Sequence, residues 1–379
     1  MKFIHLSDLH LGKKLHQLSL LGDQEYILEE ILNIVKEEKP DALLLAGDIY
    51  DKIYPPAEAV ALFDSFLVRL AEEKCRVFVI SGNHDSPERI AFLGRLTKLA
   101  GVYLSPVYQG EAEGITLEDE FGEVTVWLLP FIKPLHVRHF YPKEEITDYT
   151  QAMEVAIRQM SIDSTKRNVL VAHQFVLGAS RSDSEEVSVG GLDHVAAEVF
   201  ADFDYVALGH LHRPQWVGRK EVRYSGTPLK YSFSESEDKK SVTVIELGEK
   251  GQVKIREYPL TPRREVLRLK GEFLNLMEKE DISDRVREAY VQITLLDEED
   301  VPDAFNRLSL VYSGLLHLEY DNTRTRTNRE IRVRKEHAIL SPEQLFAGFY
   351  EEMNNQPLNE KQLAYLQEKM ETIWKGESL

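Results

Sequence analysis

The distribution of apolar positions predicts alternating strands and helices over most of the first 260 residues. Five apolar runs have the length of strands and end abruptly in polar residues: KFIHLSDLH (2–10), ALLLAGDIYD (42–51), VFVISGNHD (77–85), NVLVAH (168–173) and YVALGHLHRP (205–214). Continuous apolar runs of this kind are typical of strands buried on both faces. Helical patterns at 24–39 and 56–73 separate the first three runs, which favours βαβ connections. The pattern therefore predicts an α/β fold.

The residues that end these runs share one property, which is a side chain able to bind a metal ion. They are Asp8, His10, Asp48, Asp51, Asn83, His84, Asp85, His173, His210 and His212. In α/β sheets, ligands gather at the carboxyl ends of the strands. We therefore expect the five strand ends to meet at one edge of a single layer.

The pattern changes after the fifth run. Short, turn-rich runs at 221–226, 241–248 and 252–260 predict antiparallel strands. The residues PLTPRRE that follow are typical of a linker, and mixed strand and helix patterns continue beyond them. The predicted division of the chain is a first domain of residues 1–262, a small α+β domain of residues 263–340 and a helical tail of residues 341–379.

The tail carries two amphipathic patterns. Ser341, Pro342 and Glu343 are typical of a helix start, and the apolar residues of one helical face follow them: Leu345, Phe346, Phe349, Tyr350 and Met353. A second pattern has the a and d spacing of short heptads, with Leu363, Leu366, Met370 and Ile373, followed by Trp374. Such a helix either binds a partner coiled coil or packs back onto its own domain. The sequence leaves both alternatives open.

Length and composition suit a protein of two domains. The chain has 379 residues, of which 43% are hydrophobic, enough to build a core. Its single cysteine, Cys75, excludes an intramolecular disulfide and a cysteine-rich zinc site, which favours a reducing compartment. The chain begins directly in a strand pattern, and no apolar run approaches membrane-spanning length. We therefore expect a soluble cytoplasmic protein.

The net charge of −18 argues against a general nucleic-acid binder, whose surface would be basic. Local basic clusters do occur: Lys13 with Lys14, the residues KPLHVRH at 133–139, and NTRTRTNREIRVRK at 322–335. Such clusters either form solvated faces or contact a nucleic-acid backbone. If they contact DNA, removing several of them should weaken binding to all sequences alike.

The candidate ligands suit two metal ions better than one. Seven of them are too many for one tetrahedral ion and suit two ions that share a carboxylate: Asp8, His10, Asp48, Asn83, His173, His210 and His212. Asp48 is the natural bridge, because it lies in the middle motif beside Gly47. Oxygen and imidazole ligands fit manganese, iron or zinc. Two such ions, about 3.5–4 Å apart, catalyse in-line phosphoryl displacement.

His84 is the candidate general acid. It lies between Asn83 and Asp85, next to the predicted ions, but is not needed as a ligand. A positioned proton donor of this kind accelerates a reaction by roughly 10²–10⁴-fold. Asp85 is expected to orient its ring, as a carboxylate beside a histidine often does.

The order of the motifs carries a resemblance to a known family. Asp-x-His, Gly-Asp-x-x-Asp, Gly-Asn-His-Asp, a lone histidine and Gly-His-x-His resemble the calcineurin-like metallophosphoesterase superfamily. Within it, SDLHLGKKLH, AGDIYD, ISGNHDSPERI, GHLHRPQ and YSGTPLKYSFSE are similar to the family of SbcD nuclease subunits. The resemblance implies a two-sheet α/β sandwich flanked by helices, a dinuclear metal site at its edge, a small α+β capping domain and C-terminal helices that bind a partner.

The activity that the resemblance implies is manganese-dependent cleavage of DNA, as a double-strand exonuclease and a single-strand or hairpin endonuclease. The implied partners are DNA and an SbcC-like SMC ATPase, with the chain as a homodimer within a heterotetramer that acts in DNA end processing, recombination, repair and replication. The family's ligands map onto the seven residues above, and its catalytic histidine maps onto His84. Other branches have a histidine where this chain has Asp51, so no second catalytic histidine is carried over.

Two other functions remain open from the sequence. A stand-alone phosphodiesterase acting on nucleotides would have the same metal site, and a scaffold joining DNA ends to an ATPase would keep the motifs as a vestigial site. The chain has no Gly-x4-Gly-Lys-Ser/Thr loop, so any ATP dependence must come from another chain. Salt-sensitive DNA binding with metal-dependent hydrolysis would favour the nuclease.

Overall fold

The computed structural model describes residues 1–180, 182, 185, 194–278, 283–323, 325, 346–347, 350, 358–359, 362–363 and 365–366. Most of the predicted tail and of the basic cluster at 322–335 lies outside these residues. By its packing the chain divides into a first unit of Met1–Arg268, Asp281–Gln292 and Val311–Leu316, and a second of Leu269–Glu280, Ile293–Leu310 and His317–Leu379. Within the described part of the chain, no helix is both long and apolar enough to cross a membrane.

The first unit contains two six-stranded sheets. The strands of the first sheet, in order, are β16 (Val253–Pro259), β15 (Ser241–Leu247), β1 (Lys2–Leu6), β4 (Ala42–Ala46), β5 (Arg76–Ile80) and β6 (Val102–Leu104). Neighbours from β1 to β6 are parallel, whereas β15 is antiparallel to both β1 and β16. The first three predicted runs therefore lie side by side as β1, β4 and β5.

The other two predicted runs lie in the second sheet. Its strands, in order, are β13 (Gln215–Val217), β14 (Arg219–Tyr224), β12 (Tyr205–Gly209), β9 (Arg167–His173), β8 (Gly122–Leu129) and β7 (Glu113–Asp119). The four central strands are parallel and the two edge strands antiparallel. The strand β14, expected to be antiparallel, is therefore antiparallel to β13 but parallel to β12. The expectation of a single layer is wrong, because strands buried on both faces can also face a second sheet.

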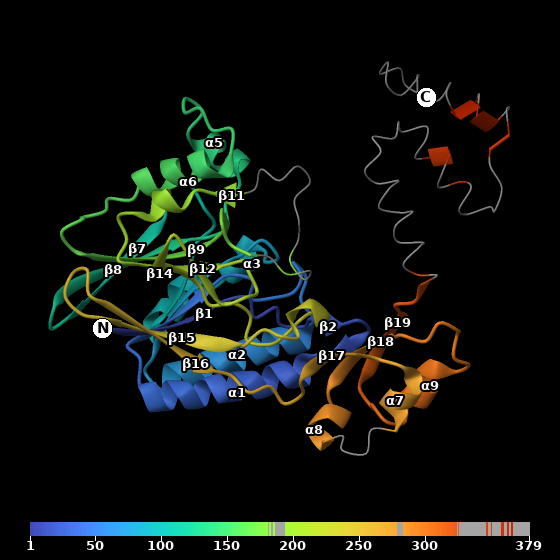
Figure 1. Ribbon diagram of the computed structural model, residues 1–379. Coiled ribbons are helices and arrows are strands. Elements are labelled where there is room, and N and C mark those ends of the chain that lie inside the picture. The colour runs from blue at the N-terminus through green and yellow to red at the C-terminus, as the bar shows by residue number, and fades with distance from the viewer. Residues whose placement is uncertain are drawn as a thin grey trace. The chain divides into compact units, whose positions relative to one another are not determined.

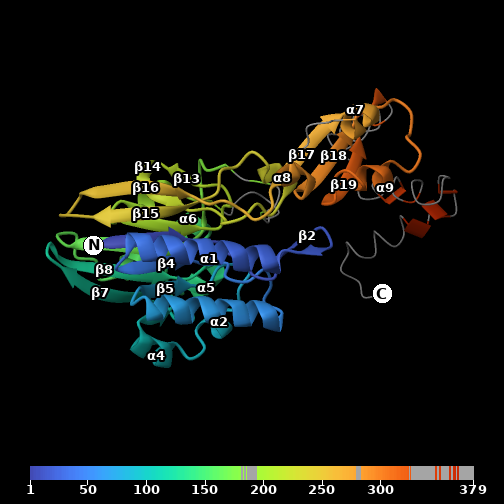
Figure 2. The same cartoon turned by 90° about the horizontal axis from the view of Figure 1, so that it is seen from below.

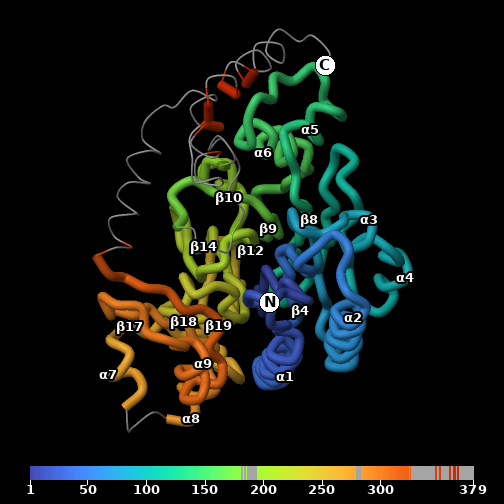
Figure 3. Tube along the Cα trace, turned by 90° about the vertical axis from the view of Figure 1, so that its right-hand side faces the viewer, coloured from blue at the N-terminus to red at the C-terminus, as the bar shows by residue number. Residues whose placement is uncertain are grey.

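The two sheets pack face to face, and helices cover their outer faces (Figure 1). Alternate strand residues fill the core between the sheets, among them Phe3 and Phe78 from one sheet and Val171 from the other. The helices α1 (Leu21–Glu38) and α2 (Ala57–Glu72) lie side by side against the first sheet (Figure 2). The helices α5 (Pro134–Phe140) and α6 (Tyr149–Arg158) cover the second sheet, on the side away from α1 and α2 (Figure 3). The first unit is thus a four-layer α/β sandwich.

The remaining elements are short. Two small ladders pair β2 (Lys14–Leu15) with β3 (Leu18–Ser19) and β10 (Phe175–Val176) with β11 (His194–Val195). Short helices are α3 (Pro87–Ile90), α4 (Gly94–Thr97), η1 (Lys98–Ala100), η2 (Ala197–Phe200) and η3 (Phe233–Glu235). After the linker, β17 (Val266–Gly271), β18 (Tyr290–Leu295) and β19 (Leu315–Tyr320) form a three-stranded sheet, accompanied by α7 (Phe273–Met277), α8 (Asp284–Arg287) and α9 (Ala304–Ser309).

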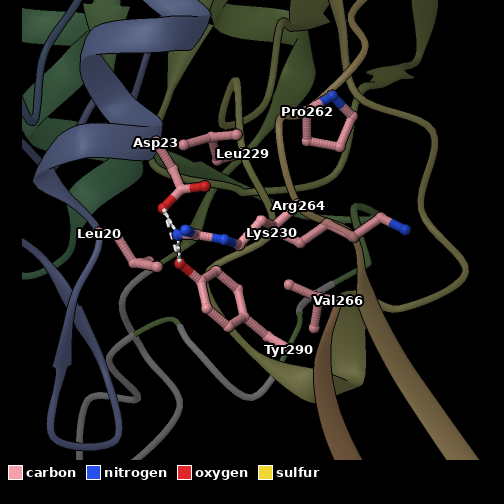
Figure 4. Close-up of a pocket in the computed structure, with 8 residues that line it drawn as sticks. All are labelled: Leu20, Asp23, Leu229, Lys230, Pro262, Arg264, Val266 and Tyr290. Carbon is pink, nitrogen blue, oxygen red and sulfur yellow. Dashed lines mark hydrogen bonds and ion pairs between the residues drawn. The ribbon is translucent and has the colours of Figure 1, made fainter. Parts of the chain in front are cut away.

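Polar contacts hold the linker segment to the start of α1 (Figure 4). The Tyr290 hydroxyl donates to Asp23 Oδ2 at 2.7 Å and accepts from Arg264 Nη1 at 2.9 Å. These side chains line a small cavity together with Leu20, Leu229, Lys230, Pro262 and Val266. Its volume of about 10 Å³ admits no more than a single water molecule. This region is therefore a packing contact of the first unit and not a ligand site.

Candidate metal centre

The seven predicted ligands and His84 lie together where the carboxyl ends of strands from both sheets meet. The first sheet supplies the residues after β1, β4 and β5: Asp8, His10, Asp48, Asn83 and His84. The second sheet supplies the residues at the end of β9 and after β12: His173, His210 and His212. Contacts of 2.9–3.5 Å join the two sets across the edge of the sandwich. The strand-end pattern thus brought all eight residues to one place.

One group of ligand atoms comes from Asp8, His10 and His212, and these atoms lie within 4.8 Å of one another. His10 Nε2 and His212 Nε2 face each other at 3.2 Å, and all three side chains are buried. Two imidazole lone pairs at this distance repel unless a proton or a cation lies between them. The geometry of this group is therefore suited to a bound cation.

A second group gathers around the amide oxygen of Asn83. This Oδ1 lies 2.9 Å from His173 Nε2 and 3.0 Å from His210 Nδ1. The other ring nitrogen of His173, Nδ1, donates to the main-chain oxygen of Ala46 at 2.8 Å. That bond fixes the ring, so that Nε2 is the nitrogen that faces the site.

The Asp48 carboxylate lies between the two groups. Its Oδ2 is 3.7 Å from His10 Nε2 and 3.5 Å from His173 Nε2. Ligand atoms of Asp8, Asp48 and His173 come within 4.8 Å of one another, as do those of His10, Asp48 and His84. Asp48 therefore occupies the position that a carboxylate shared by two ions requires.

The backbone of the site is strained. Four of its residues have left-handed φ angles: Asp8 at 53°, His10 at 44°, Asp48 at 50° and His210 at 110°. Such conformations cost about 1–3 kcal/mol each for a residue other than glycine and concentrate at functional sites. A Cβ on Gly82 would lie 2.1 Å from Asp48 Oδ1, so glycine is required for this close approach. The loops are thus held in conformations that turn the polar side chains inward.

Burial and mutual charge shift the pKa values of the site in the absence of metal. Burial raises the pKa of Asp8 to about 6. Burial would also raise the pKa of Asp48, but the surrounding imidazoles, His173 foremost, outweigh it and hold that pKa below its ordinary range. Burial would lower the pKa of His173, but the Asp48 charge raises it to about 9. The buried carboxylates thus require nearby positive charge, which a divalent cation can supply.

The donor set fits divalent metal ions. Carboxylate, amide and imidazole donors converge, and no thiolate is among them, which is the set expected for manganese, iron or zinc. Among the described residues, Asp48 belongs to two of the three groups of close ligand atoms, one with His10 and His84 and one with Asp8 and His173.

Comparison with known proteins agrees with this geometry. Residues 1–214, which contain all eight site residues, match the calcineurin-like phosphoesterase family. The chain is 31% identical over 369 residues to the SbcD subunit of the nuclease SbcCD from Staphylococcus epidermidis, with 96% of both chains covered. It belongs to the SbcD family of calcineurin-like phosphoesterases. The SbcD subunit from Staphylococcus saprophyticus is 30% identical, again with 96% of both chains covered.

The comparisons also extend to the second part of the chain and to solved structures. Residues 262–354 match the family described as the type 5 capsule protein repressor C-terminal domain. A dimetal phosphatase from Danio rerio aligns with 68% of this chain and 96% of its own, with a TM-score of 0.43 and 10% identity. Membership of the SbcD family confirms the predicted metallophosphoesterase fold and makes the chain a metal-dependent phosphodiester hydrolase.

In this SbcD-family site, the His84 ring forms a hydrogen bond with Asp51 and not with Asp85. His84 Nδ1 donates to the main-chain oxygen of Asp51 at 3.1 Å, and its Nε2 lies 4.0 Å from Asp48 Oδ2. The Asp85 carboxylate instead accepts main-chain N–H groups of the loops after β4 and β5, those of Ile49, Tyr50 and Gly82. The expectation that Asp85 orients His84 is wrong, because these bonds occupy both oxygens of Asp85.

The side chain of Asp51 also lies at the site. Its Oδ1 forms an ion pair with Lys13 Nζ at 2.7 Å and lies 3.9 Å from His10 Nδ1. That His10 nitrogen is buried and makes no hydrogen bond with the described residues. Of the two basic residues predicted near the first motif, Lys13 thus contacts the site, whereas Lys14 is exposed.

Sequence reasoning missed the residues that support the ligands from behind. The buried Gln24 amide donates to Leu9 O at 3.3 Å and to His10 O at 2.8 Å. The Tyr231 hydroxyl also donates to Leu9 O, and its ring lies edge-on to His10. Glu235 lies 3.6 Å from His212 Nδ1. Tyr231 and Glu235 belong to the motif YSGTPLKYSFSE, which is similar to the family. The contacts of these two residues could not be predicted from the motif, because they form only in the folded chain.

Proposed function

We propose that this chain is the DNA-cleaving subunit of a two-metal nuclease that acts as a double-strand exonuclease and a single-strand or hairpin endonuclease. One ion would be held by Asp8, His10, Asp48 and His212, and the other by Asp48, Asn83, His173 and His210. The observation that carries the proposal is the position of Asp48 Oδ2, 3.7 Å from His10 and 3.5 Å from His173. When bound, two ions so placed would activate water and neutralise charge on the phosphate.

His84 is the proposed proton donor to the leaving alkoxide. The bond from Nδ1 to Asp51 O fixes the ring, so Nε2 is the atom that would carry the proton to substrate. The side chain is 18% exposed, whereas the neighbouring Asp48 side chain is 3% exposed, so His84 is the more accessible to a substrate. Asp51 contributes as a positioning residue through its main-chain oxygen.

Manganese is the metal we propose. Oxygen donors from carboxylates and Asn83 share the site with imidazoles, and this mixture suits manganese, iron and zinc. Manganese is favoured among them for one reason. The relatives are named as nuclease subunits, and the family resemblance implies manganese for the nuclease activity. Titration of the metal-free protein with each of the three ions, followed by DNA cleavage, tests this choice.

DNA is the proposed substrate, and the same nuclease relatives support it. Because the net charge is −18, contact with phosphates must be local, and Lys13 beside the site is the first candidate. Replacing Lys13 and Lys14 by glutamine should weaken binding to all sequences and flatten its salt dependence. An unchanged salt dependence would exclude these lysines from the DNA contact. A DNA substrate would place the chain in the cytoplasm.

An SbcC-like SMC ATPase is the proposed partner, because the relatives are named as subunits of SbcCD. We assign residues 1–262 to the nuclease domain, 263–340 to a capping domain and 341–379 to binding of the ATPase. The match of residues 262–354 to a separate family supports a boundary near residue 262. A pull-down of the ATPase by the full chain and by a chain ending at residue 340 tests the assignment of the tail.

A homodimer within the heterotetramer is the proposed assembly. The segment from α3 to η1 exposes four large apolar side chains, with Phe92 at 70%, Leu93 at 54%, Leu96 at 60% and Leu99 at 87% exposure. Apolar surface of this kind is suited to contact with a second copy. Replacement of Leu96 and Leu99 by glutamate should yield a monomer by light scattering. The control, replacement of the equally exposed Leu310 at 86%, should remain dimeric.

Cleavage of an end-labelled duplex and of a nucleotide-sized phosphodiester, with manganese or EDTA, tests the proposed activity. His84→Ala should lose duplex cleavage while binding two manganese ions normally, and the exposed His317→Ala should cleave like the wild type. Cleavage of the small diester alone would assign the chain to the stand-alone phosphodiesterases. Absence of both activities, even with an SMC-like ATPase and ATP, would favour the scaffold.

A further inference from the structure

Buried residues hold the polar groups of His212. Its main-chain N–H donates to Glu185 Oε1 at 2.6 Å. Its main-chain oxygen accepts from Thr227 N at 3.1 Å and from Lys240 Nζ at 2.8 Å. Its ring Nε2 faces the first ligand group, and its Nδ1 faces Glu235 Oε1 at 3.6 Å. The main chain of His212 is thus fixed by hydrogen bonds, and each of its ring nitrogens has a polar neighbour.

Glu235 and Lys240 form a buried ion pair, with 0% and 4% of their side chains exposed. Lys240 Nζ lies 2.5 Å from Glu235 Oε2, 2.8 Å from His212 O and 2.8 Å from Thr227 Oγ1. The ammonium group thus has a partner for each of its three protons. A buried pair is stable only when its hydrogen bonds are made. The Glu235 oxygen farther from Lys240, Oε1, is the one that faces His212.

We propose that Glu235, fixed by Lys240, positions the His212 ring as a metal ligand and strengthens it as a donor. The proposal rests on the function proposed above, because it requires His212 to bind metal. A ligating histidine commonly donates its second N–H to a carboxylate or a carbonyl, which orients the ring and raises its basicity. The segment YSGTPLKYSFSE contains none of the proposed ligands or catalytic residues. This contact gives it a role in supporting the metal centre.

The two proposed metal positions differ in this support. His173 donates to a neutral carbonyl, that of Ala46, at 2.8 Å, whereas His212 faces a carboxylate. A carboxylate polarises an imidazole more strongly than a carbonyl does. Loss of Glu235 should therefore weaken the position that contains His212 and leave the position that contains His173 largely unchanged.

An ion pair with a purely structural role would not need to contact both the main chain and the ring of His212. Lys240 binds the main-chain oxygen of His212, and Glu235 faces its ring. The pair of Asp204 and Lys250, at 2.8 Å, provides a comparison. Asp204 is buried, and among the described residues it otherwise accepts only main-chain N–H groups. Asp204→Asn is therefore the matched control for Glu235→Gln.

The test is manganese binding, followed through the EPR signal of the free ion. In the double variant Glu235→Leu with Lys240→Met, both charges leave together, so no unpaired charge stays buried. We expect this variant to bind one of its two ions about 10–100-fold more weakly. Glu235→Gln, which keeps an acceptor, should lose less, and Asp204→Asn should bind both ions like the wild type.

A spectroscopic signal separates positioning from loss of structure. With cobalt(II) in place of manganese, a ligating ring N–H gives an exchangeable NMR signal shifted far outside the normal range, and His212→Ala identifies the one from His212. This signal should be present in the wild type and exchange rapidly with solvent in the double variant. If the double variant fails to fold, manganese binding and the N–H signal of Glu235→Gln test the role of Glu235 instead.

The outcomes distinguish this inference from the proposed function. A folded double variant that binds both ions as the wild type does, with an unchanged N–H signal, overturns the role of Glu235 alone. A wild type that does not bind two ions, or a His212→Ala variant that keeps both affinities, overturns the proposed ligand set instead.

Discussion

The buried histidine His5 gives a quantitative prediction about stability and pH. It lies between the two sheets, fully buried, with Nδ1 accepting from the Tyr205 hydroxyl at 3.0 Å and Nε2 donating to Leu208 O at 3.2 Å. Burial, followed by the charge of Arg223, lowers the pKa of its imidazole to about 3. In the unfolded chain the pKa of a histidine is about 6.5. Between these values only the unfolded state binds the proton.

The stabilisation from neutral His5 is therefore complete above pH 6.5 and is lost as the pH falls toward 3. Each pH unit in this window changes the free energy of unfolding by about 1.4 kcal/mol. At pH 4.5, two units below the unfolded pKa, the loss is about 3 kcal/mol. His5→Gln keeps a donor and an acceptor but does not titrate, so its free energy of unfolding should lack this pH-dependent loss.

The assay is denaturant unfolding of the wild type and His5→Gln at pH 7.5 and 4.5, in EDTA, followed by fluorescence. The buried Trp127 in the second sheet makes the signal sensitive to that sheet. Titration of all other groups is common to both proteins, so the difference between them isolates His5. We expect the wild type to lose about 3 kcal/mol more than the variant. Equal losses in both proteins would refute the reasoning.

Two further predictions concern the site and the linker. Gly82→Ala should weaken manganese binding by at least tenfold in a titration, because its Cβ would lie 2.1 Å from Asp48 Oδ1; normal affinity would mean that the loop yields without consequence. Tyr290→Phe should lower the free energy of unfolding by about 1–3 kcal/mol, because Asp23 stays buried without its 2.7 Å donor, and DNA cleavage under native conditions should stay unchanged. An unaltered denaturation midpoint would contradict the second prediction.

The common location of the predicted ligands could be predicted from the sequence because each follows a local pattern of the chain. Asp48 and His173 each follow a continuous apolar run, and parallel strands bring their carboxyl ends to a common edge whatever the details of pairing. The division of those strands between two sheets depends on which faces pack together. That choice involves residues far apart in sequence, so the expectation of a single layer failed.

The supporting residues were not accessible in the same way. Asp85 is next to His84 in sequence, yet its carboxylate binds three main-chain groups of neighbouring loops. Glu235 lies 23 positions after His212, a spacing that carries no periodic signal, and it reaches the ring through the fold. Hydrogen-bond partners of this kind are fixed by tertiary packing and not by the pattern of strands and helices.

The most direct test of the central claim is the EPR spectrum of the protein loaded with two manganese ions, beside Asp48→Ala. If Asp48 bridges two ions, the wild type should give the spectrum of an exchange-coupled manganese pair, as expected for ions about 3.5–4 Å apart. Asp48→Ala should lose the coupling and at least one ion. Two uncoupled manganese signals in the wild type, or a coupled pair that survives in Asp48→Ala, would contradict a dinuclear centre built on this carboxylate.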